Sequence, residues 1–171
     1  MKHLDEIEQG AAQLQAMHKK IHATFDESRS AEWSQACAEF HSSYNSLAYP
    51  GGLDAGMASL KSGSNDAIET AVQFLEVDPM FFGSGYIKEG LIQHLKHADL
   101  TPGQKERLNV VILRLVELRG RREFRRYCRL ACRTRSRNLE MELRKHLSSN
   151  DPSVRRRAKW VLDALSNHEE G

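Results

Sequence analysis

The chain has 171 residues and a net charge of only +2, and its length suits one domain that buries about two-thirds of the surface its unfolded form exposes. No apolar run approaches the roughly 20 residues that cross a bilayer, and an odd number of cysteines, three, argues against a complete disulfide framework. The small net charge hides two opposed halves. Residues 1–100 carry 7 Lys and Arg against 14 Asp and Glu, a balance of −7, whereas residues 101–171 carry 18 against 9, a balance of +9. Such a split indicates charged partners and names no reaction.

The N-terminal residues show no sign of export. Met1 leads directly into the charged stretch Lys2–Glu6, with no basic segment followed by an apolar one. Cysteines outside a disulfide framework fit a reducing compartment. We therefore expect a cytoplasmic protein that folds as a single helical domain over residues 1–171, with no membrane partner.

Apolar residues at helical spacing dominate the start of the chain. Steps of three, four or seven predict a long amphipathic helix over residues 4–25 and, after a polar turn, a second one over residues 33–44. Pro50 and the two glycines that follow break the backbone, because proline lacks a donor and glycine favours positive φ. A short helix over residues 53–60 fits after this break.

The middle of the chain reads as two further helices around a turn. The apolar spacing predicts a helix through residues 68–75 that stops before Pro79, because the residue before proline is pushed out of the α region. Residues 80–82, Met-Phe-Phe, are then expected to pack as an apolar elbow. Another amphipathic helix follows over residues 86–97.

The second half contains two strong helix starts. Thr101–Pro102 combines an N-cap hydroxyl with proline at the first helical position, and the helix should run to residue 120. Two helices follow, one from Arg121 and one through residues 139–147. Asp151–Pro152 repeats the cap-plus-proline start of the last helix.

No segment alternates apolar and polar residues with β-branched enrichment, so we predict no strands. The fold class is therefore all-α, an irregular multi-helix bundle of eight or nine helices. Residues 151–165 look like the second half of a HEAT-type unit, which predicts HEAT-like helical pairs toward the C-terminus. No period of about 40 residues recurs, so a regular solenoid is not expected.

Arginine supplies every cation between residues 119 and 137. Guanidinium groups form bidentate bonds to phosphate and stack on rings, so this segment is a candidate nucleic-acid surface. The alternative is a solvated helix face that pairs with the acidic half of the same chain. Phe124 lies on the expected buried stripe, so we assign it to the core. The candidate basic face comprises Arg121, Arg122, Arg125, Arg126 and Arg129.

Residues that could carry chemistry do not form a convincing set. Three pairs share a helix face at the spacing of zinc ligands, but none brings a third ligand nearby. Those pairs are His18 with His22, His94 with His97, and Cys128 with Cys132. Ser84, between two glycines, lacks the context of a nucleophile elbow. We therefore expect no metal, no cofactor and no catalytic residue, and hence no enzyme.

Three stretches of this chain, taken together, resemble a known class of bacterial proteins. They are FHSSYN and LAYPGGL within residues 40–53, FLEVDPMFFGSGYIKE at residues 74–89, and REFRRYCRLA at residues 122–131. The likeness is to small helical immunity proteins encoded beside polymorphic bacterial toxins, including those of contact-dependent growth inhibition and Rhs-type systems. It implies a toxin–antitoxin role, in which the protein binds the toxic domain of a cognate toxin and neutralises it without chemistry.

The resemblance also implies a docking face, since such proteins commonly oppose the charge of their toxin. Many toxin domains are nucleases with basic clefts, which favours the acidic half of this chain. The candidate toxin-binding residues there are Asp26, Glu27, Glu32, Glu39, Asp54, Asp66 and Glu69. The alternative function is a nucleic-acid-binding, HEAT-like protein that uses the arginine-rich face. The sequence leaves the oligomeric state open.

Overall fold

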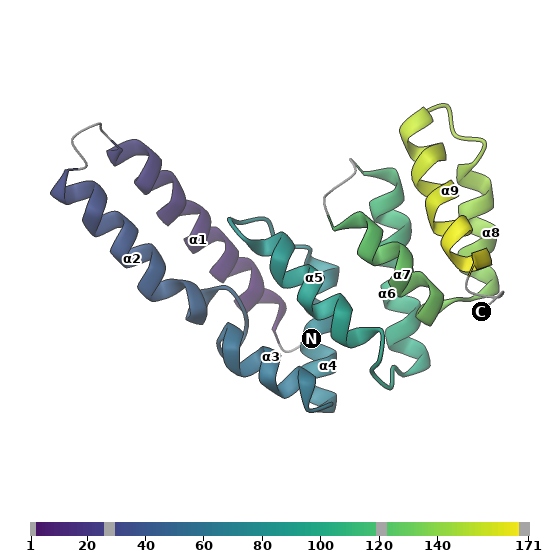
Figure 1. Cartoon of the computed structure of the whole chain (residues 1–171), viewed down its shortest axis with the longest axis horizontal. Helices are drawn as coiled ribbons and strands as arrows, with labels where there is room; N and C mark the ends of the chain where they lie inside the picture. The colour runs from purple at the N-terminus through teal and green to yellow at the C-terminus, as the bar shows by residue number, and fades with distance from the viewer. Residues whose placement is uncertain (1–2, 26–29, 119–122, 168–171) are drawn as a thin grey trace. The chain divides into compact units, whose positions relative to one another are not determined.

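The structure, a computed structural model, describes residues 3–25, 30–118 and 123–167. Within these ranges the chain forms nine α-helices and no strand, which confirms the all-α, multi-helix prediction (Figure 1). No described helix is both long and apolar enough to traverse a bilayer. The chain divides into two compact units, unit 1 (residues 1–87) and unit 2 (residues 88–171), with the boundary inside α5 (Ser84–Leu95). The single-domain prediction stays a prediction, and the units are described separately.

Unit 1 is built on two long helices that pack side by side. Its complete helices are α1 (Leu4–Thr24), α2 (Ala31–Leu47), α3 (Leu53–Lys61) and α4 (Asn65–Val77). Both α1 and α3 pack against α2 and α4. Gly10 allows α1 and α2 to cross closely, because a Cβ there would collide with the carbonyl oxygen of Leu47. Leu14 and Val72 are fully buried in the core of this unit.

Unit 2 consists of successive helices in contact. After the rest of α5 come α6 (Pro102–Glu117), α7 (Phe124–Thr134), α8 (Arg137–His146) and α9 (Pro152–Asn167). Helix α7 packs against α6 and α9, and α8 also packs against α6 and α9. Ile112, Leu130, Leu139 and Val161 are fully buried between these helices. Phe124 is buried as well, which confirms its assignment to the core.

Local capping explains where α2 and α6 begin, whereas α7, predicted from Arg121, begins at Phe124 without a side-chain cap. The Ser30 hydroxyl accepts a hydrogen bond from the backbone N–H of Trp33 at 3.2 Å, at the start of α2. Thr101 and Gln104 form a reciprocal pair at the start of α6: the Thr101 hydroxyl accepts from the Gln104 N–H at 3.3 Å, and the Gln104 side chain accepts from the Thr101 N–H at 3.0 Å. These bonds satisfy backbone donors that would otherwise have no partner in the first turn.

The turn between α4 and α5 differs from the predicted apolar elbow. Helix α4 ends at Val77, and its C-cap residue Asp78 has a left-handed φ of 53°. The prediction is wrong for Met80 and Phe82, which are 52% and 63% exposed. The turn is attached to unit 1 through its backbone. The Tyr44 hydroxyl donates a hydrogen bond to the carbonyl oxygen of Phe82 at 3.1 Å. Met80 and Phe82 thus remain largely exposed, although the Phe82 ring contacts His18 and Phe40.

Candidate functional site

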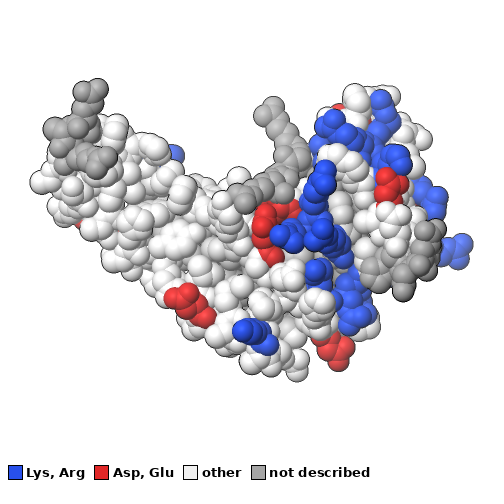
Figure 2. Space-filling model, viewed as in Figure 1, with Lys and Arg blue, Asp and Glu red and all other residues white. Residues whose placement is uncertain are grey.

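The opposed charges found along the chain belong to different structural units. Unit 1 carries 5 Lys and Arg against 12 Asp and Glu, a balance of −7, and unit 2 carries 20 against 11, a balance of +9. Figure 2 shows Lys and Arg side chains gathered over unit 2 on the face in view. Unit 2 is therefore the part of the chain suited to an anionic ligand.

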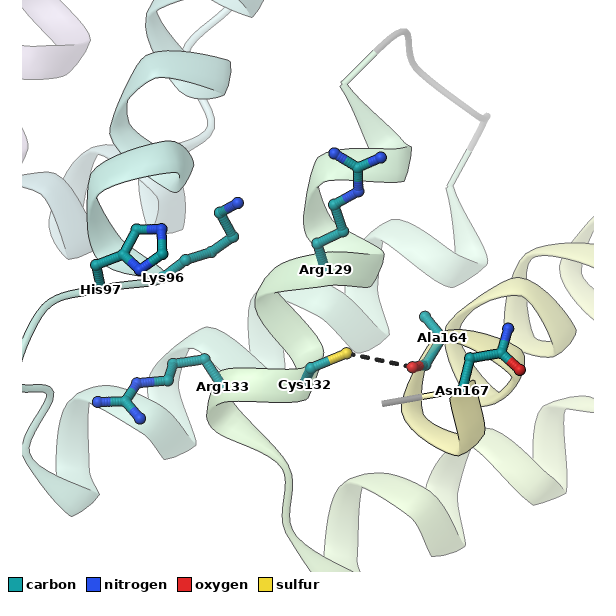
Figure 3. A pocket seen from close by; sticks show the side chains of 7 residues that line it. All are labelled: Lys96, His97, Arg129, Cys132, Arg133, Ala164 and Asn167. Atoms are coloured by element: carbon teal, nitrogen blue, oxygen red, sulfur yellow. Dashed lines mark hydrogen bonds between the residues drawn. The ribbon is translucent and has the colours of Figure 1, made fainter. Parts of the chain in front are cut away.

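The cations of unit 2 line a pocket between three helical segments (Figure 3). The turn that follows α5, helix α7 and the last turn of α9 form its walls. The cavity volume is 630 Å³. The pocket is lined by Lys96, His97, Arg129, Cys132, Arg133, Ala164 and Asn167.

The lining of this pocket is cationic without compensation by carboxylates. In the part of the chain that the structure describes, no Asp or Glu lines the pocket, and neither Lys96 nor Arg129 forms an ion pair. Arg133 donates one hydrogen bond, at 3.4 Å, to the carbonyl oxygen of Ala98, which leaves its charge unneutralised. Positive charges this close together repel one another, so an anion that enters the pocket lowers their electrostatic energy.

A second hollow adjoins the first and continues it along α7 and α9. It has a volume of 420 Å³ and shares Arg129, Ala164 and Asn167 with the pocket. Its other lining residues are Arg125, Cys128, Trp160 and Asp163. We call the two hollows together the arginine groove.

An aromatic ring lies among the cations of the arginine groove. Trp160 is 40% exposed. The guanidinium carbons of Arg125 and Arg156 lie 5.8 and 5.6 Å from the centre of its ring, within cation–π range. The one carboxylate of the groove, Asp163, binds Lys159 through both oxygens at 2.9 and 3.0 Å. It therefore does not neutralise the arginines.

Helix α7 supplies a row of arginines because of its periodicity. Arg125, Arg129 and Arg133 are four residues apart, and all three are exposed. At 1.5 Å per residue they extend over about 12 Å, a length over which one strand of a B-form duplex presents about three phosphates. The spacing suits the backbone of a nucleic acid.

The cysteine thiols in this region are suited to packing. Cys132 donates from its sulfur to the carbonyl oxygen of Ala164 at 3.4 Å, and burial raises the pKa of its thiol (Figure 3). Burial likewise raises the pKa of Cys128 to about 11. Both residues are thiols at neutral pH, which is the unreactive form. No group of three His, Cys, Asp or Glu residues within the described ranges could hold a metal ion.

The predicted basic face is divided by the structure. Arg121 and Arg122 lie outside the described residues. Arg125 and Arg129 line the arginine groove, but Arg126 is half-buried, and its Nε lies 3.9 Å from a carboxylate oxygen of Glu89. The sequence also allowed an alternative to a nucleic-acid surface, in which arginines pair with the acidic half of the chain. Arg126, which lies beside Glu89, fits that alternative.

Sequence reasoning missed much of the arginine groove. Arg133 belongs to the predicted arginine-rich segment 119–137 but not to the five residues of the predicted basic face. The prediction did not include Lys96, His97 or Trp160, which lie in the turn after α5 and in α9. The four-residue spacing of the arginines in α7 could have identified Arg133. The others have no signal in the sequence, because only the fold brings the turn after α5 next to α7 and α9.

The predicted acidic residues occupy separate local environments. Asp26 and Glu27 lie outside the described residues. Glu32, Asp54 and Asp66 lie in the first turns of α2, α3 and α4, where a carboxylate stabilises the positive end of the helix dipole.

The other two predicted carboxylates already have partners. Glu39 accepts from Lys20 at 2.9 Å and from Gln35 at 3.0 Å, and the bond from Lys20 is the main reason that its pKa is lowered. Glu69 accepts from Gln73 at 2.9 Å. These contacts lie within unit 1 and explain both side chains without a ligand.

Comparison of the chain with protein-family models, with curated proteins and with solved structures gives no match. The resemblance to immunity proteins and the HEAT-like character of the C-terminal helices therefore stay predictions. The functional assignment rests on the geometry and charge of the chain itself.

Proposed function

We propose that this protein binds nucleic acid through the arginine groove of unit 2, as a binding protein without catalysis. The observation that carries the proposal is the row of Arg125, Arg129 and Arg133 beside Lys96, with no ion pair to any of the four among the described residues. Guanidinium groups bind phosphate oxygens in bidentate geometry, and release of counterions from the nucleic acid drives the association.

The arrangement favours contacts with the sugar-phosphate backbone over reading of the sequence. The hydrogen-bond donors of the groove are cationic side chains, which bind phosphate groups. Contacts with the phosphate backbone position a protein on nucleic acid but do not distinguish one base from another. Trp160 adds a partly exposed ring of the kind that stacks on unpaired bases. We therefore expect broad specificity and strong dependence on salt.

Fluorescence anisotropy with a labelled single-stranded RNA and a labelled duplex of about 20 nucleotides tests the proposal. Arg129→Gln and Arg133→Gln should each weaken binding of all sequences alike, and each should reduce the slope of log K against log salt by about 1. The control is Arg144→Gln, which removes an exposed cation on α8 outside the groove. Absence of binding at low salt, or equal effects of all three variants, would refute the proposal.

Neutralisation of a cognate toxin is the second candidate function. The observation that favours it lies in unit 1, where two of the three stretches behind the resemblance come together. The Tyr44 hydroxyl of the first stretch donates to the backbone of Phe82 in the second. The buried ring of Phe40, also from the first stretch, packs against the Phe82 ring, which is 63% exposed. Exposed aromatic surface is typical of protein interfaces. Co-expression with a neighbouring toxin gene tests this candidate, and failure both to bind and to protect would remove it.

A further inference from the structure

Unit 1 contains a groove, separate from the cationic site of unit 2, between α2, α3 and the start of α5. Two adjoining hollows of 460 and 350 Å³ share Tyr44, Leu53, Asp54 and Phe82 in their walls. We call this feature the aromatic groove. Its main side chains are Phe40, Tyr44, Asp54, Met57, Phe82 and Tyr86.

The rings of the aromatic groove are held in place and partly uncovered. Phe82 and Tyr86 are each 63% exposed. Phe40 supports the cluster from beneath, with ring-centre distances of 5.5 Å to Tyr44 and 6.2 Å to Phe82, and His18 stacks on Phe82 at 5.1 Å. Uncovered rings fixed by neighbours are suited to binding, because little side-chain entropy remains to be lost.

One carboxylate faces these rings without a cation of its own. The backbone N–H of Asp54 donates to Asn45 at 3.0 Å, which fixes the start of α3. Its side chain is exposed and forms no ion pair with any residue that the structure describes. Asp54 differs in this from Glu39, which Lys20 neutralises.

We propose that the aromatic groove binds an arginine side chain from a basic segment of a partner protein. The π faces of Phe82 and Tyr86 attract a guanidinium, whose planar surface stacks on rings, and the Asp54 carboxylate accepts its N–H groups. The balance of −7 on unit 1 steers a basic segment toward the groove and repels phosphate. The groove belongs to unit 1 and acts independently of the arginine groove.

The probe is a fluorescently labelled tetra-arginine peptide, acetylated and amidated, with tetra-citrulline as its neutral isostere. Titration of the full chain at low salt should give saturable binding of tetra-arginine and none of tetra-citrulline. Asp54→Asn and Phe82→Ala should each weaken binding by about three- to fivefold, since each removes one of the three groups that contact the guanidinium.

The chain offers a matched control for each variant. Asp66→Asn removes the same charge from the same first-turn position of another helix, and Phe25→Ala removes another exposed ring from unit 1. Both should change binding less than about twofold, because surface substitutions away from the contact have small effects. Circular dichroism checks that the variants remain folded.

Two results would overturn the proposal. Equal weakening by Asp54→Asn and Asp66→Asn would indicate diffuse attraction to an acidic unit, and equal binding of tetra-citrulline would show that the groove does not recognise the guanidinium charge. If the chain protected against a toxin yet failed to bind tetra-arginine, the toxin-neutralising function would stand and the proposed role of the aromatic groove would be refuted. Nucleic-acid binding, which depends on unit 2, is measured separately.

Discussion

The guanidinium of Arg157 lies inside unit 2, although the two arginines before it, Arg155 and Arg156, are exposed. It is 5% exposed, and its Nε donates to the carbonyl oxygen of Val116 at 2.7 Å. A second nitrogen donates to the carbonyl oxygen of Glu117 at 3.4 Å. The side chain thus satisfies carbonyl groups at the C-terminal end of α6, which have no partner within the helix. Arg157 is a structural residue, whereas Arg125 and Arg129 remain available to a ligand.

Arg157→Met should destabilise the protein by roughly 2–4 kcal/mol, because it leaves buried carbonyl groups without donors. Urea unfolding followed by circular dichroism measures the free energy. The control is Arg156→Met, an exposed neighbour that should cost less than about 1 kcal/mol. Similar losses for the two variants would contradict the structural role of Arg157.

Burial of Cys128 predicts a loss of stability in alkali. Burial raises the pKa of its thiol from 9.0 to about 11, so the unfolded chain releases this proton at lower pH than the folded protein does. The free energy of unfolding is unaffected by this group below pH 9 and falls as the pH rises from about 9 to 11. Thermal melts across this range should show a smaller fall for Cys128→Ala than for the wild type. If the melting temperatures of the variant and the wild type fell equally with pH, groups other than Cys128 would control the loss of stability in alkali.

At the scale of helices, local signals fix where an element begins, and packing decides which face is buried. Helix α6 starts at the predicted Thr101–Pro102 pair, because the capping bonds need only residues within one turn. The α4–α5 turn shows the opposite case, since Met80 and Phe82 are apolar and yet exposed. Tertiary contacts of the backbone, such as the one from Tyr44, override the apolar pattern there.

Removal of the cap of α6 should weaken unit 2. Thr101→Ala removes the hydroxyl that accepts from the Gln104 N–H and should cost about 1 kcal/mol in urea unfolding. Thr101→Ser keeps an acceptor in place and should cost only a few tenths of that amount. If serine proved as costly as alanine, the loss would come from the methyl group and not from the cap.

At the scale of the whole chain, the dominant feature is the division of charge between the units. A net charge of +2 results from −7 on unit 1 and +9 on unit 2, so the chain presents strong fields of both signs. Fields of this kind act over about 10 Å at 0.1 M salt. Each unit can therefore attract its own class of partner, with nucleic acid proposed for unit 2 and a basic protein segment for unit 1.

The divided charge predicts retention on ion exchangers of both signs. At pH 7 and low salt, the chain should bind a quaternary ammonium resin through unit 1 and a sulfonate resin through unit 2. The double variant Asp54→Asn with Asp66→Asn should elute earlier from the first resin only. Retention on the sulfonate resin alone would indicate that the acidic unit projects no field of its own.

The sequence alone determined the all-α class, the helix starts and the division of charge, because these depend on neighbours within a turn or on composition. Only the tertiary structure decided which arginines form a site. With 3.6 residues per turn, nearby arginines point in different directions, so Arg126 meets Glu89 while Arg129 lines the groove. The same holds for Asp54. It is one of three predicted toxin-binding carboxylates that lie in first turns, and only the packing of α3 next to the α4–α5 turn places it beside exposed aromatic rings. Residues far apart in the chain form each groove, and no local pattern encodes that proximity.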